Sequence, residues 1–368
     1  MTKYHIAYLA CTAAVVGAGL GAAPSSAAGH HTHVVRPGQS IQQAVDAAAP
    51  GDTVLVTRGT YRESVTVTTP RLTLRGLGPG VVIEPGAAPA TTATAATPAT
   101  GAARVAADCA SSGNGVCVVG TKANPVEGVT LSSLTVTGFT KSGVHAYATD
   151  GLNVRNVTAV KNGVWGIAQE ASTRGVFRGN TARDNGDAGL FLANTVTEEE
   201  GATDTLGTRV ERNRLEGNRI GVTVRRLRNL TVEDNRVTGN CAGVFLVGDE
   251  NKPKAGAVTV AANTVVANNK SCPKTARLDA LQGSGIVLTG TEDALLTDNE
   301  IHDNAGNSPL SGGIVLLKSF VGATSDRNRV SDNRLSGNVP ADLVDQSPGK
   351  DNTFQGNTCA LSRPAGLC

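Results

Sequence analysis

The chain has 368 residues, of which 40 % are hydrophobic, 17 % are charged and only 3 % are aromatic, with 44 glycines. This length exceeds what one globular core usually reaches, yet no linker divides the sequence into two ordinary domains, so a repeat architecture packed from aliphatic side chains is favoured. The formal net charge of +2 excludes the strongly basic surface that is typical of nucleic-acid-binding proteins.

Residues 1–28 are predicted to be a secretory signal peptide. Lys3 precedes a short apolar run rich in Gly and Ala, and a small-residue cleavage context follows at Pro24–Ala28. No later segment is apolar over enough residues to cross a bilayer, so we expect a secreted, extracellular protein without a membrane span. Residues 29–33 are expected to form a histidine-containing tail ahead of one folded domain over 34–368.

The folded domain is expected to open with a capping helix. Ser40 is suited to be the N-cap of a short amphipathic helix. Strands are expected at Thr53–Thr57, Ser64–Val67 and Arg71–Leu74, with Arg58–Tyr61 as a connection. A helix placed before these strands would cover the open end of a stack and protect its sheet edge.

Residues 86–103 interrupt this pattern with low-complexity Ala/Thr/Pro sequence. The segment has no core-forming periodicity, and we expect a loop that bulges from an early strand turn.

The strongest pattern is an internal repeat, N-x-x-x-x-N, with an apolar or small third position. Its copies begin at Asn180, Asn213, Asn235, Asn263, Asn299 and Asn333. Many copies are followed by a glycine and a short alternating apolar strand, with these glycines at Gly143, Gly166, Gly189, Gly221, Gly243, Gly285 and Gly313. Asn213 and Asn235 lie 22 residues apart, a length that three short strands joined by tight turns would fill.

One such copy cannot bury its inward side chains, whereas stacked copies can. Neighbouring copies would then pair as parallel strands at about 4.8 Å, with each asparagine above the next at the same bend. There its amide can bond the copies above and below, and Asn also tolerates the left-handed conformation that a bend needs.

The capping segment and these repeats together resemble the right-handed parallel β-helix proteins of the pectate-lyase-like superfamily, from approximately Val34 to Cys359. The resemblance implies an all-β fold: a single-stranded right-handed parallel β-helix of about ten or more rungs of three short strands, with a short N-terminal capping helix. The signature segments of pectate lyases, polygalacturonases and mannuronan epimerases are absent, so no catalytic residue is carried over by motif.

Six cysteines remain beyond the predicted signal peptide, an even number that favours disulfides in an exported protein. Six cysteines allow fifteen connectivities, and unpaired buried thiols are the alternative. Their order favours the neighbour pairs Cys109 with Cys117, Cys241 with Cys272, and Cys359 with Cys368.

In the superfamily that this sequence resembles, the ligand usually lies along the outside of one sheet and is flanked by loops. Here the insertions border the strands that follow the repeat glycines, so a groove is expected there. Alternation turns four proton-handling side chains of the early rungs outward. We assign His145 or Tyr147 as proton carrier, Glu170 as partner carboxylate and Arg225 as the group that holds an acidic sugar.

The later rungs turn an apolar stripe outward, which includes Phe245, Val287, Val315 and Leu317. A stripe this apolar does not face water, so either the Cys241–Cys272 loop covers it or it meets a protein partner or a second copy. As substrate-binding residues we predict the outward aromatics and the polar groups near them, namely Phe191, Phe245, Asp187, Asp249 and Lys252.

Two metal sites are open hypotheses. Glu198, Glu199 and Asp204 offer carboxylate oxygens that could hold Ca²⁺, with a solvated charged loop as the alternative. Signal removal would put His30 or His31 third in the mature chain, where an amine, two amides and an imidazole can bind Cu(II), with a flexible tail as the alternative.

The sequence therefore favours a secreted β-helix protein that binds an extracellular polysaccharide, acidic or neutral, along a loop-flanked sheet. Whether it also cleaves that polymer as a lyase or hydrolase stays open. The alternatives are a non-catalytic surface or matrix binding protein and, third, a copper-handling accessory protein. Convergence of the early-rung polar groups would favour catalysis, and a bare apolar stripe would favour binding.

Overall fold

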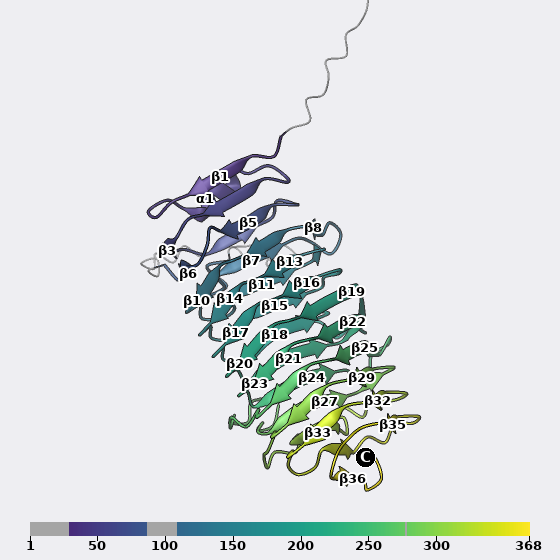
Figure 1. Cartoon of the computed structure of the whole chain (residues 1–368). Coiled ribbons are helices and arrows are strands. Elements are labelled where there is room, and N and C mark those ends of the chain that lie inside the picture. Colours follow the sequence, from purple (N-terminus) through teal and green to yellow (C-terminus); the bar gives the residue numbers. More distant parts are fainter. Residues whose placement is uncertain (1–28, 87–108, 277) are drawn as a thin grey trace, which may run out of the picture.

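The computed structural model describes residues 29–86, 109–276 and 278–368. In this part of the chain, successive turns stack along one axis, and most turns add one short strand to each of three long parallel sheets (Figure 1). The fold is the expected all-β, single-stranded right-handed parallel β-helix.

The strands of sheet 1 pair in the same order as the successive turns of the β-helix. Its strands are β1 (Thr32–Val35), β2 (Thr53–Val56), β5 (Thr73–Gly76), β9 (Thr130–Ser132), β13 (Asn153–Arg155), β16 (Val176–Arg178), β19 (Thr203–Glu211), β22 (Leu227–Glu233), β25 (Ala255–Ala261), β29 (Leu295–Thr297), β32 (Arg329–Ser331) and β35 (Thr353–Gln355), with β28 (Thr291–Glu292) paired to β25.

Sheet 2 follows each strand of sheet 1 after a tight bend. Its strands are β3 (Gly59–Arg62), β6 (Val81–Glu84), β10 (Thr135–Thr137), β14 (Thr158–Val160), β17 (Thr181–Arg183), β20 (Arg214–Glu216), β23 (Arg236–Thr238), β26 (Thr264–Val266), β30 (Glu300–His302) and β33 (Arg334–Ser336).

Sheet 3 contains the strands that follow the repeat glycines. Its strands are β4 (Val65–Val67), β7 (Val116–Val119), β11 (Val144–Tyr147), β15 (Ile167–Glu170), β18 (Ala188–Ala193), β21 (Ile220–Arg225), β24 (Ala242–Val247), β27 (Ser284–Thr289), β31 (Gly312–Leu316), β34 (Leu343–Asp345) and β36 (Ser362–Arg363), while β8 (Val126–Glu127) and β12 (Thr149–Asp150) pair separately.

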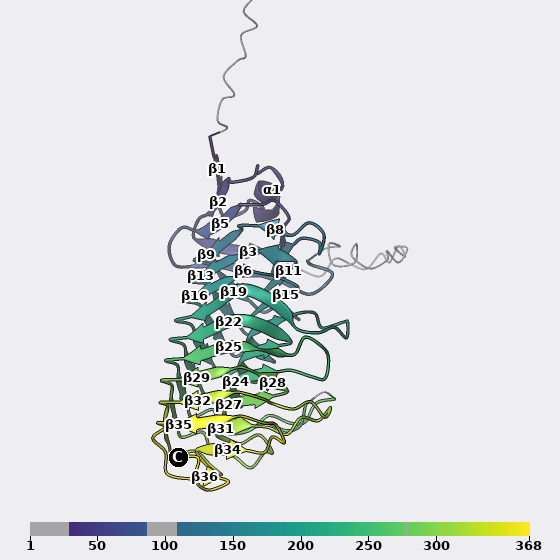
Figure 2. The same ribbon diagram turned by 90° about the vertical axis from the view of Figure 1, so that its right-hand side faces the viewer.

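The predicted capping helix is present as α1 (Ile41–Asp46), at the N-terminal end of the stack (Figures 1 and 2). The Ser40 side chain accepts a hydrogen bond from the backbone N–H of Gln43, as an N-cap does. Glu63 adds a carboxylate that accepts the N–H groups of Ile41 and Gln42 at 2.7 and 3.1 Å. Ile41 and Val45 are buried on the first turn, so the helix covers the open end of the core.

One strand was not expected. Gly59–Arg62, predicted to be a connection, is β3, and it pairs with β6. Tyr61 is its inward residue at 2 % exposure, and its hydroxyl donates to the Thr57 carbonyl at 2.8 Å. The prediction was wrong because the glycine and the two polar neighbours hide a period-two strand with only one large apolar side chain.

The core runs through the centre of the helix as layers of aliphatic side chains. On sheet 3 the predicted inward residues are all buried in it: Val144, Ile167, Leu190, Val222, Val244, Ile286 and Ile314. Parallel strands keep these positions in register, since Val144 lies opposite Ile167, which lies opposite Leu190. The register of sheet 3 therefore also fixes which side chains face outward.

Both asparagines of each repeat form stacked ladders, as predicted. In one of them, Asn213 Nδ2 donates to Asn235 Oδ1 at 2.9 Å, and Asn235 Nδ2 donates to Asn263 Oδ1 at 2.9 Å. The second ladder ends at a carboxylate: Asn338 Nδ2 donates to Asp342 Oδ1 at 2.8 Å. These amides are buried, so each ladder bond replaces a bond to water inside the stack.

The left-handed backbone of the bend lies one residue earlier than expected. The residue before the ladder asparagine takes the positive φ, as in Gly179 (64°) before Asn180, Arg212 (55°) before Asn213 and Asp234 (55°) before Asn235. The asparagine itself has turned its side chain inward to reach the next amide, so the preceding residue makes the bend.

The three neighbour pairs of cysteines are disulfide-bonded: Cys109–Cys117, Cys241–Cys272 and Cys359–Cys368. β1 begins at Thr32, so the expected tail 29–33 overlaps the first strand. The predicted signal peptide and almost all of the low-complexity segment 86–103 lie outside the described residues. Within those that are described, no helix is long and apolar enough to span a membrane.

Candidate functional site

The outer face of sheet 3 carries three columns of side chains. Column 1 is formed by the residue just before each glycine, such as Ser142 and Trp165. Column 2 includes His145, and column 3 includes Tyr147 and Glu170. Along all three columns the face divides into an open part near β7, β11 and β15 and a covered part from β18 onward.

The covered part buries the predicted apolar stripe. Phe245, Val287, Val315 and Leu317 are between 0 and 4 % exposed and belong to one outer cluster that also contains Leu281. Leu281 comes from a covering loop, residues 269–276 and 278–283, that the Cys241–Cys272 disulfide ties to β24. The stripe is thus covered by the chain itself, and the predicted partner or self-association surface is not exposed.

Arg219 holds the covering loop in place by hydrogen bonds. Its guanidinium donates to the backbone carbonyls of Pro273 at 2.7 Å and Asp279 at 3.2 Å. Arg219 is only 8 % exposed, so these two bonds replace hydrogen bonds to water that its guanidinium N–H groups lose on burial.

The predicted aromatic sugar platforms are buried. Phe191 and Phe245 are 6 and 4 % exposed, so neither offers a free ring face. Phe191 is covered by Trp165, whose ring lies nearly parallel to it with centroids 4.2 Å apart. Trp165 is only partly buried and reaches the open part. Asp187 accepts its indole N–H at 3.2 Å, so this carboxylate orients Trp165.

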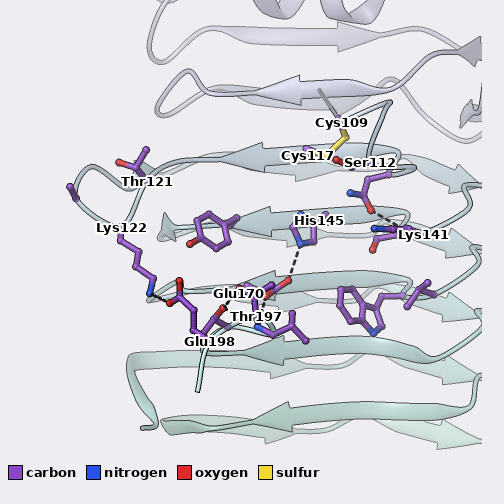
Figure 3. A pocket seen from close by; sticks show the side chains of 18 residues that line it. Cys109, Ser112, Cys117, Thr121, Lys122, Lys141, His145, Glu170, Thr197 and Glu198 are labelled. Atoms are coloured by element: carbon purple, nitrogen blue, oxygen red, sulfur yellow. Dashed lines mark hydrogen bonds and ion pairs between the residues drawn. A yellow bond between two sulfur atoms is a disulfide. The ribbon is translucent and has the colours of Figure 1, made fainter. Parts of the chain in front are cut away.

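The open part is hollowed into a pocket of about 860 Å³ (Figure 3). We call it the open pocket. Its walls come from sheet 3, the loop after β7, the loop before β11 and a rim loop, residues 194–202. The lining includes Asn114, Lys122, Lys141, Ser142, His145, Tyr147, Trp165, Glu170, Thr195, Val196 and Glu198.

His145 and Glu170 form a hydrogen-bonded pair in this pocket. His145 Nε2 and Glu170 Oε1 are 3.1 Å apart, with side chains 16 and 8 % exposed. A carboxylate oxygen only accepts, so Nε2 carries the proton and, in the neutral ring, Nδ1 keeps a free electron pair. No described residue bonds to that nitrogen, whereas Glu170 Oε2 is held by the Val196 N–H at 2.9 Å. The pair therefore presents a fixed, oriented base.

Tyr147 lies two residues along β11 from His145 and lines the same pocket. Burial raises the pKa of its phenol, and the nearby carboxylates of Glu198 and Glu170 add to that effect, although Lys122 opposes it. Tyr147 is therefore a protonated donor at neutral pH.

The rim loop is tied across the mouth of the pocket. Lys122, in the loop after β7, bonds Glu198 at 2.8 Å (Figure 3). It also bonds Glu200 at 3.1 Å. The hydrogen bond with Glu198 raises the pKa of Lys122, and in turn Lys122 lowers the pKa of Glu198. This ion pair spans two intervening strands, β11 and β15, and closes the pocket where those strands end.

The structure does not support the predicted calcium site. Glu198 bonds Lys122, Glu199 pairs with Arg226, and Asp204 accepts from Asn229 at 3.1 Å. No cluster of three or more His, Cys, Asp or Glu side chains suited to a metal ion forms among the described residues. Glu198 and Glu199 pair with different cations and Asp204 bonds an amide, so the three carboxylates do not converge on one point.

The other predicted residues lie outside the pocket lining. Arg225 Nη1 donates to the Thr195 carbonyl at 2.6 Å, so it supports the rim loop from beneath. Asp249 pairs with Arg226, and Lys252 is exposed in the loop before β25. Arg225, Asp249 and Lys252 thus do not converge with His145.

His30 and His31 precede β1, and His33 is its second residue. The His31 N–H donates to Asp52 Oδ1 at 2.7 Å, and His33 Nε2 lies 2.9 Å from Asp52 Oδ2. Hydrogen bonds from the His31 N–H, His33 and the Ala49 N–H hold the pKa of Asp52 well below its usual range. A copper site that uses the His31 amide would have to break its bond to this carboxylate.

Comparison with known families agrees with the fold. The family described as right handed beta helix region matches residues 107–270, and the family described as periplasmic copper-binding protein (NosD) matches residues 194–362. No curated protein matches the sequence at a significant level.

Solved structures share the architecture at low identity. The A-module of mannuronan C-5 epimerase AlgE6 from Azotobacter vinelandii has 20 % identity and a TM-score of 0.53, covering 86 % of this chain and 88 % of that one. An alginate lyase from Paenibacillus sp. str. FPU-7 has 13 % identity and a TM-score of 0.56, covering 87 and 99 %. DFA-IIIase from Arthrobacter chlorophenolicus A6 without its lid, in complex with GF2, has 15 % identity and a TM-score of 0.58, covering 90 and 89 %. At these identities the likeness shows the fold alone.

Proposed function

We propose that this chain, a right-handed parallel β-helix protein of the pectate-lyase-like superfamily, binds an acidic extracellular polysaccharide in the open pocket and removes a proton from one of its uronate sugars. The observation that carries the proposal is the His145–Glu170 pair, which shares one pocket with Tyr147 and two lysines. Such a set holds a base, a proton donor and cations for an acidic ligand.

The chemistry balances without a cofactor. His145 Nδ1 takes the proton at C5 of the uronate, and the electron pair of that C–H bond forms a double bond between C4 and C5. The C4–O bond to the neighbouring sugar breaks, and the departing oxygen receives the proton of the Tyr147 hydroxyl. The Lys122 ammonium, which lies near Tyr147, stabilises the negative charge that develops on the sugar carboxylate. Return of a proton to the opposite face of C5 would instead give an epimer.

Three observations support this class of function over a non-catalytic binding role. His145 and Glu170 of the early rungs lie within hydrogen-bond distance of each other, Tyr147 lines the same pocket, and the apolar stripe is covered. The solved structures with the same fold include proteins named as a mannuronan C-5 epimerase and an alginate lyase, which makes a uronate polymer the first substrate class to test. The disulfides are in keeping with an extracellular or periplasmic protein.

A copper-handling function has less support. The segment matched by the copper-binding family contains one histidine, His302, and no methionine, while its cysteines Cys241, Cys272 and Cys359 are in disulfides. His302 is paired with Asp303 at 2.8 Å. Nitrogen and sulfur ligands for copper are therefore scarce in that segment.

The test is incubation with a panel of uronate polymers in D₂O, with two readouts. Absorbance of unsaturated sugar ends reports a lyase, and deuterium at C5 without such ends reports an epimerase. Absence of both readouts on every acidic polymer, alongside measurable binding, would leave a binding protein and overturn the catalytic proposal.

A further inference from the structure

The end of the open pocket at which strand β11 begins holds polar groups that the proposed chemistry does not use. Ser142 is 1 % exposed, and its hydroxyl forms no hydrogen bond with any described residue. It occupies column 1, where the side chains of Trp165 and Ala188 on the next turns belong to the outer cluster. Ser142 lines the pocket and shares this column on the outer face of sheet 3. A buried hydroxyl without a partner is costly unless a ligand supplies the bond.

Lys141 lies beside this hydroxyl and is exposed. Its ammonium makes no ion pair within the described residues, in contrast to Lys122, which is bound by Glu198 and Glu200. Figure 3 shows the two lysines at opposite ends of the pocket. An incoming anion therefore meets one available ammonium, at the Lys141 end.

Asn114 completes the group from the turn above. Its Oδ1 accepts the Ser142 N–H at 3.0 Å, which fixes the amide, and its Nδ2 group has no acceptor among the described residues. The residue is 6 % exposed and lines the pocket. The lining carboxylates, Glu170 and Glu198, are engaged with His145 and Lys122. Three hydrogen-bond donors thus line this end of the pocket, and no free carboxylate of the lining competes for them.

We infer that Lys141, Ser142 and Asn114 form an oxyanion subsite that holds the carboxylate or sulfate of a sugar residue. The inference rests on the proposed function, because the ligand is the same acidic polymer. Ser142 and His145 are three residues apart, at most about 10 Å along the backbone. The bound acidic group therefore belongs to a sugar next to the one that reacts, and the subsite selects polymers with acidic neighbours.

The experiment compares Lys141→Gln and Ser142→Ala with the wild type and with Lys318→Gln, an exposed lysine outside the pocket lining. Binding is measured by calorimetry at several salt concentrations. The probes are a uronate oligosaccharide, the same oligosaccharide with its carboxyls reduced to alcohols, and a sulfated oligosaccharide.

Lys141→Gln is expected to weaken binding of the acidic probe about tenfold and to flatten its salt dependence, since one charge-assisted contact is lost. Ser142→Ala is expected to weaken the same binding several-fold while raising the Tm of the free protein, because it removes an unpaired buried hydroxyl. Lys318→Gln and the carboxyl-reduced probe should show no such change. Preference for the uronate or the sulfated probe identifies which oxyanion the subsite takes.

The outcomes separate the subsite from the chemistry. If the wild type exchanges the C5 proton, and Lys141→Gln and Ser142→Ala both bind the acidic probe as tightly as the wild type does, the subsite is overturned and the proposed function stays intact. Salt-dependent binding that Lys141→Gln weakens, without any exchange at C5, would support the subsite and overturn catalysis. A lower Tm for Ser142→Ala would show a structural hydroxyl, and a wild type that binds no acidic probe would overturn both proposals.

Discussion

The open and covered parts of sheet 3 consist of turns with the same repeat pattern, yet only the open part forms a pocket. Their inward residues, Val144 on β11 and Val244 on β24, are equally buried in the same core. They differ outside, where column 2 carries His145 in the open part and Phe245 in the covered part. The covering loop closes over the apolar half and ends before the polar half. In this fold the inward face specifies the structure, and the outward face together with its loops specifies the site.

The largest expected effect tests whether the two parts differ in chemistry. His145→Ala should lower kcat by about 10²- to 10⁴-fold, because it removes the oriented base. Thr223→Ala changes a column 2 residue in the covered part and should leave kcat near the wild-type value. Deuterium incorporation at C5 measures both variants. Equal losses would mean that the pocket is not where the proton is removed.

The second prediction concerns what keeps the covered part closed. Replacing Cys241 and Cys272 by alanine releases a loop whose ends are 31 residues apart in sequence. Loop-closure entropy predicts a loss of about 3 to 4 kcal/mol in the free energy of unfolding. Denaturant unfolding measures that loss, and increased binding of a hydrophobic dye would report the exposed stripe. The open pocket should keep its ligand affinity, and a parallel loss of affinity would show that the two parts are coupled.

The third prediction uses the raised pKa of Tyr147. Its folded pKa lies above the unfolded value of about 10, so the native state holds this proton more tightly. The stability that it contributes is complete below the unfolded pKa and is lost as the pH rises through the folded pKa. Ultraviolet titration of the wild type minus Tyr147→Phe should show one phenol ionising above pH 10. Ionisation near neutral pH would make Tyr147 a base and reverse its proposed role.

The smallest expected effect is on stability, and it is tested on one exposed ion pair from each part of sheet 3. Lys122 bonds the rim loop, and Lys274 bonds Asp279 at 2.7 Å in the covering loop. Exposed pairs contribute about 0 to 1 kcal/mol, so Lys122→Gln and Lys274→Gln should both unfold close to the wild type. Lys122→Gln should nevertheless change the KM for long polymers several-fold, since it removes the ion pair that holds the rim loop across the pocket mouth. An identical KM in the two variants would contradict a role for the Lys122 ion pair in substrate binding.

Much of the fold and part of the site could be predicted from the sequence. Periodicity placed Val144 inward and His145 outward because a strand alternates regardless of its neighbours. The same logic brought His145, Tyr147 and Glu170 to one face. It could not bring in Lys122, which reaches the pocket from a loop without a repeat, or show that Arg225 turns toward the Thr195 carbonyl.

Trp165 and Ser142 were missed for a different reason. They stand before the repeat glycine, outside the alternating strand, where a bend rather than the pleat sets the side-chain direction. The signal was nevertheless present, since Trp165 is the single tryptophan of a chain with few aromatic residues. Burial of Phe191 and Phe245 depended on the covering loop and the indole, neither of which a strand pattern describes.

The second asparagine ladder has a polarity with a consequence of its own. Every amide in it donates toward the C-terminal end, and Asp342 receives the last donation from Asn338 without being able to pass one on as a carboxylate. Its other oxygen accepts from the Ala360 N–H at 2.9 Å, which turns the final segment back over the stack. Asp342 therefore ends the ladder: whole turns can be duplicated upstream of it, whereas an asparagine in a turn appended after it would find no ladder donor for its side-chain oxygen.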